Sequence, residues 1–181
     1  MNVLLVCDNP NVAVQVMSAL VGEEDLDILE VRTPQRALAV LDEGQSFDIV
    51  VADADTTPTG GMYLSHEIKA REQMGQDMPP VLLLIAREQD HWLSKWSEAD
   101  ACVLKPTDAF DLSTVVHALA EDEPMPALPG VWAEPTPGVL TMPHPPSVEG
   151  EGQGEGEGAA AAGRRGSNQG QGGAGDADDR A

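Results

Sequence analysis

The sequence predicts one α/β domain, in which parallel strands alternate with helices, followed by a long C-terminal tail. Five short apolar runs alternate with helix-like segments over the first 121 residues, which is the pattern of consecutive strand–helix units. Most of the 18 Gly and 14 Pro of the 181-residue chain lie beyond this region. We therefore expect a folded domain at residues 1–121 and a disordered tail at residues 122–181.

The apolar runs have the length and composition of central strands. Runs that are apolar on both faces suit a parallel sheet that is covered by helices on both sides. Residues 26–32 alternate more strongly between apolar and polar side chains, which favours an edge strand. The strands are expected at residues 2–8, 26–32, 48–53, 80–86 and 101–106.

The segments between these runs carry helix signals. Asn9 before Pro10 and Thr33 before Pro34 are typical of a helix N-cap followed by the first helical residue. Residues 112–119 carry apolar side chains at helical spacing, which predicts an amphipathic helix. Weaker signals for two further helices follow the third strand and the fourth strand. The pattern is thus (βα)5, with right-handed crossovers between the strands.

Charge and cysteine content narrow the functional classes. The net charge is −21, from 31 acidic and 10 basic residues, and both the domain and the tail are acidic. Such a surface repels nucleic-acid phosphates, so direct nucleic-acid binding is not expected. The two cysteines, Cys7 and Cys102, have no paired spacing, and the N-terminus carries neither a signal peptide nor a membrane span. We expect a cytoplasmic protein.

Charged side chains follow three of the expected strands. Asp8 follows the first strand, Asp53 and Asp55 follow the third, and Lys105 follows the fifth. Ligands of open α/β sheets bind outside the carboxyl ends of the strands, so these side chains should share one crevice. Carboxylates from two loops can hold Mg2+. A carboxylate can also accept a phosphoryl group when a cation and an amine neutralise the developing charge.

These motifs resemble those of response-regulator receiver domains, over residues 2–120. The sequence "LLVCDNPNV" is similar to the acidic turn of the family, "FDIVVAD" to its phosphoacceptor strand and "DACVLKPTD" to its Lys-Pro turn. The segment "TPTGGMYL" resembles the loop that leads into the third helix, and "DHWLSKWSEADA" resembles a group of atypical, stand-alone actinobacterial receivers. The resemblance implies a flavodoxin-like doubly wound fold with strand order 2-1-3-4-5.

The resemblance also implies roles for individual residues. Asp53 would be the phosphoacceptor, and Asp8 and Asp53 would bind Mg2+ together with the backbone carbonyl of Asp55. Lys105 would contact a phosphoryl oxygen, and its peptide bond to Pro106 would be cis. The usual partner would be a histidine kinase or another signalling protein.

The chain departs from the family at four places. Cys7 stands where a second acid is usual, and a thiol is a poor Mg2+ ligand. Ile85 replaces the Ser or Thr after the fourth strand, and Cys102 replaces the switch aromatic of the fifth. The loop "DADTTP" is one residue longer than usual between Asp and Pro. Without the hydroxyl and the aromatic, phosphorylation loses its usual coupling to the surface.

The leading hypothesis is a non-enzymatic, stand-alone receiver in a two-component phosphorelay. It either accepts phosphate on Asp53 or acts as a protein-interaction module without phosphate. Trp92 and Trp96 lie four residues apart on one helical face. They either pack this short helix onto the sheet or form a partner face, since Trp is enriched at binding hot spots.

An enzymatic alternative rests on the same strand. "VVADADTT" also fits the DxDxT motif of haloacid-dehalogenase-like phosphotransferases, with Asp53 as nucleophile and Asp55 as acid and base. That family also needs a Ser or Thr at the end of a later strand and a further acidic motif. The segment "LLLIA" has no hydroxyl, and nothing after Lys105 resembles the acidic motif. Nor does a helix-turn-helix or basic helix follow residue 121, so any control of DNA would be indirect.

Overall fold

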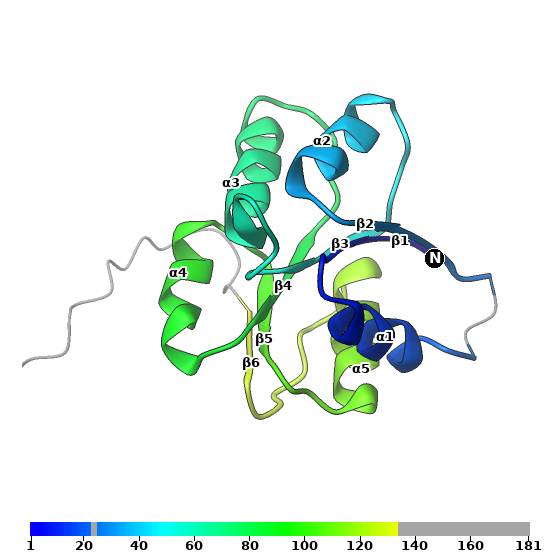
Figure 1. Ribbon diagram of the computed structural model, residues 1–181, viewed down its shortest axis with the longest axis vertical. Coiled ribbons are helices and arrows are strands. Elements are labelled where there is room, and N and C mark those ends of the chain that lie inside the picture. The colour runs from blue at the N-terminus through cyan, green and yellow to red at the C-terminus, as the bar shows by residue number, and fades with distance from the viewer. Residues whose placement is uncertain (23–24, 134–181) are drawn as a thin grey trace, which may run out of the picture. The chain divides into compact units, whose positions relative to one another are not determined.

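The computed structural model describes residues 1–22 and 25–133, which belong to one compact unit. The expected alternation of strands and helices is present, and one short strand is added after the last helix (Figure 1). The strands are β1 (Asn2–Val6), β2 (Asp27–Val31), β3 (Ile49–Asp53), β4 (Val81–Ile85), β5 (Ala101–Leu104) and β6 (Val131–Ala133). The helices are α1 (Pro10–Ala19), α2 (Pro34–Asp42), α3 (Gly60–Gln73), α4 (His91–Trp96), preceded by a 3-10 turn (Glu88–Asp90), and α5 (Ala109–Ala120).

The sheet has the strand order β2-β1-β3-β4-β5-β6. Strands β1 to β5 run parallel, and β6 runs antiparallel to β5. The order of the first five strands confirms the flavodoxin-like doubly wound topology. Strand β2 lies at an edge of the sheet and most of its residues are not buried, as its alternating polarity predicted.

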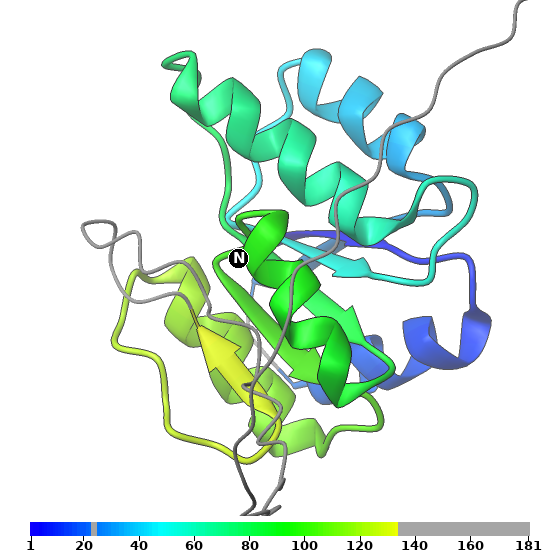
Figure 2. The same cartoon turned by 90° about the vertical axis from the view of Figure 1, so that its left-hand side faces the viewer.

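The sheet has a core on each face, because successive side chains of a strand point to opposite sides. Val3 and Leu5 of β1 pack in a cluster with residues of α1 and α5. Leu4 and Val6 pack in a second cluster with residues of α2 and α3. Figures 1 and 2 show this division, with α1 and α5 on one side of the sheet and α2, α3 and α4 on the other. Burial on both faces explains why these strands read as continuous apolar runs.

Two helices begin at the caps that the sequence predicted. The side chain of Asn9 accepts a hydrogen bond from the backbone N–H of Asn11, at 3.0 Å, before α1. The side chain of Thr33 accepts one from the backbone N–H of Arg36, at 3.2 Å, before α2. In both cases a proline follows the cap. The N–H groups of the first helical turn have no acceptor within the helix, so the missing proline N–H costs no hydrogen bond. These caps direct the chain from the carboxyl end of a strand back along the sheet.

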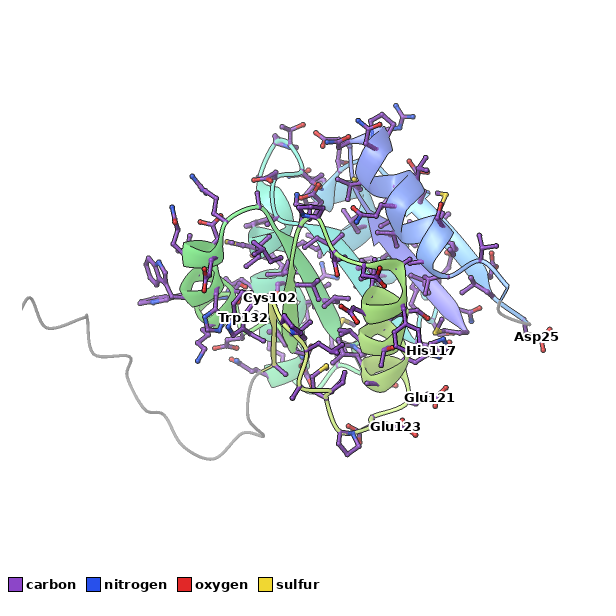
Figure 3. The ribbon with its side chains drawn as sticks, turned by 90° about the horizontal axis from the view of Figure 1, so that it is seen from below. Asp25, Cys102, His117, Glu121, Glu123 and Trp132 are labelled. Carbon is purple, nitrogen blue, oxygen red and sulfur yellow. The ribbon has the colours of Figure 1, made fainter. Side chains whose placement is uncertain are left out.

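Strand β6 was not expected, and it lies in the segment assigned from the sequence to the tail. Trp132 stands opposite Cys102 of β5, and Figure 3 shows the two residues side by side. The indole stacks on the His91 ring of α4, with ring centroids 4.7 Å apart. The sheet therefore continues beyond the boundary drawn after residue 121, because pairing with β5 orders a short segment whose Pro and Gly content suggests disorder.

The turn into β6 depends on a glycine. Gly130 has φ of 70°, a left-handed conformation that favours glycine. Its carbonyl oxygen accepts a hydrogen bond from the backbone N–H of Leu104, at 2.8 Å. The remainder of the expected tail, residues 134–181, lies outside the described residues. Within residues 1–22 and 25–133, no helix has both the length and the apolar character that a membrane span requires.

We predict that Trp132→Ala destabilises the domain by about 2 kcal/mol, because truncating a packed aromatic removes buried apolar surface and leaves a void. Thermal unfolding of the full chain measures the change. Trp96→Ala is the matched control, since its side chain is 72% exposed, and exposed positions change stability by less than about 0.5 kcal/mol. Equal stability of the two variants would show that β6 contributes nothing to the fold.

Candidate functional site

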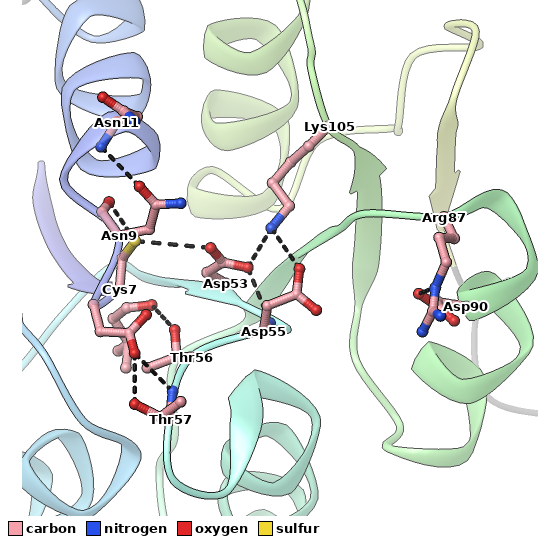
Figure 4. A network of polar contacts seen from close by, with 12 residues as sticks. Cys7, Asn9, Asn11, Asp53, Asp55, Thr56, Thr57, Arg87, Asp90 and Lys105 are labelled. Atoms are coloured by element: carbon pink, nitrogen blue, oxygen red, sulfur yellow. Dashed lines mark hydrogen bonds and ion pairs between the residues drawn. The ribbon is translucent and has the colours of Figure 1, made fainter.

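The expected site lies at the edge of the sheet where β1, β3 and β5 end. Asp53 is the last residue of β3, and Lys105 directly follows β5. Figure 4 shows Asp53, Asp55 and Lys105 converging, with Cys7 on the opposite side of Asp53. Three separate strands thus bring together residues that are far apart in the chain, as the parallel topology predicted.

The carboxylate of Asp53 is buried and has a neighbour at each oxygen. Asp53 is only 1% exposed. Oδ1 accepts hydrogen bonds from Lys105 Nζ, at 2.5 Å, and from the backbone N–H of Asp55, at 3.0 Å. Oδ2 lies 3.8 Å from the Cys7 Sγ. A buried carboxylate requires such compensation, since an unpaired one is costly to remove from water.

Lys105 supplies the positive charge of the site. Its ammonium also contacts Asp55 Oδ2, at 3.1 Å, so that one cation bridges two acids. Burial lowers the pKa of Lys105, but its hydrogen bonds and charge interactions with Asp53 and Asp55 outweigh that effect and raise the pKa above its ordinary value. Lys105 is therefore charged at neutral pH. The peptide bond between Lys105 and Pro106 is cis, as the resemblance implied.

Cys7 contributes a neutral thiol where the family usually has an acid. Its Sγ donates to the backbone carbonyl of Asn9, at 3.1 Å. The pKa of Cys7 is raised to about 11, because burial and, less strongly, the charge of Asp53 raise it by more than the Asn9 hydrogen bond lowers it. The side chain is thus a thiol rather than a thiolate at neutral pH, and the pocket carries one negative charge fewer than the usual pair of acids would supply.

Asp8 lies next to this group, but its carboxylate has other partners. Oδ2 accepts hydrogen bonds from the Thr57 hydroxyl, at 2.6 Å, and from the Thr57 backbone N–H, at 3.1 Å. These two bonds, the hydroxyl first, lower the pKa of Asp8 below its ordinary value. We call this pair of bonds the Asp8–Thr57 clasp. It ties the loop after β1 to the loop after β3.

The loop after β3, residues 54–59, is held at both ends. At its start, the Thr56 hydroxyl donates to the carbonyl of Val6, at 3.3 Å, and Thr56 is 1% exposed. At its end, a Cβ on Gly61 would lie 2.7 Å from the carbonyl oxygen of Asp53. Only glycine permits so close an approach of α3 to the end of β3. The peptide bond between Thr57 and Pro58 is cis.

The two residues that replace the switch positions of the family both lie in the core. Ile85 is fully buried, and Cys102 is 1% exposed, in the cluster on the α2 and α3 side of the sheet. The Ser94 hydroxyl donates to Cys102 Sγ, at 3.1 Å. Beyond β4, Arg87 pairs with Asp90 at 3.0 Å rather than with the acids of the site (Figure 4). The end of β4 therefore brings no hydroxyl to Asp53.

The two tryptophans of α4 form a separate exposed surface. Trp92 is 51% exposed and Trp96 is 72% exposed. Ser94, between them in the sequence, is buried and contacts Cys102 of β5. The helix thus packs through Ser94 while the two indoles face largely outward, which favours a partner face over simple packing onto the sheet.

The sequence gives Thr57 a place only in the DxDxT pattern and does not predict its contact with Asp8. Nor does it predict the contact of Thr56 with Val6. The extra residue in "DADTTP" is the signal that could have revealed them, because a longer loop brings an additional side chain over Asp8. The expected role of the Asp55 carbonyl as a metal ligand stays a prediction.

Comparison with known proteins gives a relative and several similar structures. No family model matches the chain. An uncharacterised response regulatory protein of Mycobacterium tuberculosis, found in strains CDC 1551 and H37Rv, is 34% identical over 125 residues, covering 66% of this chain and 90% of that protein.

The solved structures agree in fold. A receiver domain of a Francisella response regulator has 20% identity and a TM-score of 0.57, covering 67% of this chain and 97% of that one. The receiver domain of a Saccharomyces cerevisiae response regulator, crystallised with a histidine phosphotransfer signalling protein, has 18% identity and a TM-score of 0.59 over 66% of this chain and 88% of that one.

The mycobacterial relative decides between the receiver and the haloacid-dehalogenase-like alternative. The solved structures, at 18–20% identity, establish the fold alone. Together with the site at the ends of β1, β3 and β5, the mycobacterial relative identifies this chain as a member of the response-regulator family with a receiver domain.

Proposed function

We propose that this receiver domain is a protein-interaction module of two-component signalling that binds its partner without phosphorylation of Asp53. The neighbours of the Asp53 carboxylate carry the proposal. Oδ1 is bonded to Lys105 and to the Asp55 amide, and Oδ2 faces the Cys7 thiol. The carboxylate is thus compensated within the protein, in a pocket that lacks the usual second acid.

The parts that would couple a phosphoryl group to the surface support the same conclusion. A phosphorylation switch needs a group that senses the added phosphate and a second element that moves in response. Ile85 has no hydroxyl to contact a phosphoryl oxygen and lies in the core. Cys102 is small and buried, and Trp132 of β6 lies opposite it. Both steps of the usual switch therefore lack their side chains.

The partner face that we propose is the outer side of α4, with Trp92 and Trp96. Exposed aromatic side chains supply large contact area at low cost in conformational entropy. The yeast receiver domain of similar fold binds a histidine phosphotransfer protein, so the partner class that we propose is a histidine kinase or phosphotransfer protein. We place the module in the cytoplasm, because Cys7 and Cys102 lie buried without a disulfide, as suits a reducing compartment.

The resemblance to the receiver family implies a signalling module rather than an enzyme, and it implies a Mg2+ site. A second candidate function is therefore the usual one, phosphate acceptance on Asp53. The contact between Lys105 and Asp53 favours it, because this ammonium stands where it could neutralise a phosphoryl oxygen. The two candidates differ in whether Asp53 changes its covalent state.

Treatment with a small-molecule phosphodonor separates these two candidate functions. Full-length protein incubated with acetyl phosphate and Mg2+ should keep its mass, because Ile85 brings no hydroxyl to the incoming group and Cys7 supplies no second acid for Mg2+. Intact-mass spectrometry measures the outcome, and Asp53→Asn is the control for addition elsewhere. Addition of one phosphoryl group to the wild type but not to Asp53→Asn would establish the phosphoacceptor function in place of the one proposed.

The second prediction concerns partner binding. Among the histidine kinases and phosphotransfer proteins of the source organism, a binding partner should have the same Kd for the wild type and for Asp53→Asn. Trp92→Ala with Trp96→Ala should weaken that binding at least about tenfold, which corresponds to about 1.4 kcal/mol at a hot spot. Biolayer interferometry measures each Kd.

Phe110→Ala is a matched control for the tryptophan variants, since Phe110 is also an exposed aromatic, at 75%, but lies at the start of α5. It should leave the Kd unchanged. Loss of binding in Asp53→Asn alone would mean that the partner reads the acid site, and equal losses in all aromatic variants would remove α4 as the specific face.

A further inference from the structure

We propose that Asp8 in this receiver is a loop-positioning residue rather than a magnesium ligand, and that the pocket consequently does not bind Mg2+ at millimolar concentration. The inference goes beyond the interaction function and does not depend on it, since it concerns how the loop over Asp53 is held. It follows from the donor atoms that the site presents and from the partners that those atoms already have.

The Asp8–Thr57 clasp engages the carboxylate that a metal would need. Both bonds of the clasp end on Oδ2 of Asp8, one from the Thr57 hydroxyl at 2.6 Å and one from its N–H at 3.1 Å. The hydroxyl bond is short, as is usual for a charged acceptor. A metal ion that used Oδ2 of Asp8 would have to displace both donors and would leave the Thr57 N–H without its acceptor.

The clasp is enforced by the rest of the loop. The neighbouring Thr56 is anchored by two hydrogen bonds. Its hydroxyl donates to the Val6 carbonyl, and its N–H donates to the Asp53 carbonyl, at 3.1 Å. Gly61 anchors the far end by its close approach to Asp53. Thr57 lies between these anchors, so the longer loop places its hydroxyl over Asp8. The position of Thr57 is thus set by contacts that do not involve a metal.

The Asp53 side of the pocket is equally unsuited to Mg2+. This ion prefers hard oxygen donors in octahedral geometry, whereas Oδ2 of Asp53 faces the soft sulfur of Cys7. Oδ1 already accepts hydrogen bonds from Lys105 Nζ, at 2.5 Å, and from the Asp55 N–H, at 3.0 Å.

The clasp and the thiol together therefore replace the ion. In this arrangement the loop after β3 is organised by protein hydrogen bonds, and its position is the same with and without a divalent cation. The donor set disagrees with the Mg2+ site that the family resemblance implied for Asp8, Asp53 and the Asp55 carbonyl.

The wild-type chain provides the first test. Its Tm should not change on addition of millimolar Mg2+, relative to the same ionic strength of NaCl. Mn2+, a paramagnetic substitute for Mg2+, should not selectively broaden the amide NMR signals of residues 8, 53 and 55. A Tm rise or a selective broadening that Asp8→Asn abolishes would overturn the proposal, and this measurement needs no variant that might fail to fold.

A gain-of-binding variant tests the cause. Cys7→Asp with Thr57→Val supplies the second acid and removes the hydroxyl of the clasp, so it should acquire Mg2+ binding. Ligand linkage then predicts a Tm rise of about 5 °C when Mg2+ is at about ten times its Kd. Adding Asp8→Asn to this variant should abolish the rise.

Cys7→Asp with Thr59→Val is the matched control. Thr59 lies in the same loop, but its hydroxyl accepts a hydrogen bond from Gln35 and does not contact Asp8. This variant should bind Mg2+ at least tenfold more weakly than the Thr57→Val combination. Equal affinity of the two would show that the clasp does not keep Asp8 from the metal and would overturn the role proposed for Thr57.

Discussion

The ion pair between Lys105 and Asp53 is the interaction on which the site depends. It joins the carboxyl ends of β3 and β5, which are separated by β4 in the sheet. Asp53 is almost completely buried, so its charge needs a partner that the fold delivers reliably. Lys105 provides that partner, and Asp55 provides a second anion that keeps the ammonium charged. The charge of the buried Asp53 carboxylate is thereby compensated within the protein, before any ligand is considered.

Around this ion pair, fewer carboxylates are free to bind a cation than the family resemblance implies. The thiol of Cys7 removes a negative charge, and the Asp8–Thr57 clasp engages another carboxylate in a structural role. Both changes reduce the demand for a divalent cation. Ile85 and Cys102 fill the core where the family has switch side chains. In the function that we propose, the domain keeps the receiver fold but not the phosphorylation switch.

Strand β6 changes the other end of the sheet. It covers the edge of β5 that a five-stranded sheet would leave exposed, and unpaired edges are sites of unwanted association. Trp132 stands opposite Cys102 on β5 and stacks on His91 of α4. The helix that carries the exposed Trp92 and Trp96 is therefore held both by the sheet and by this added strand. A partner that binds Trp92 and Trp96 would therefore contact a helix whose buried side is held in place by β5 and β6.

The sequence by itself determined the (βα)5 architecture, the edge position of β2 and the caps at Asn9 and Thr33, because these follow from local patterning and short-range hydrogen bonds. It also predicted that Asp53 and Lys105 would meet, since parallel strands end at one edge of a sheet. Only the tertiary structure decided that Asp8 bonds to Thr57 and that residues 131–133 add a strand. Both depend on contacts between segments far apart in the chain, whose geometry local sequence patterns do not encode.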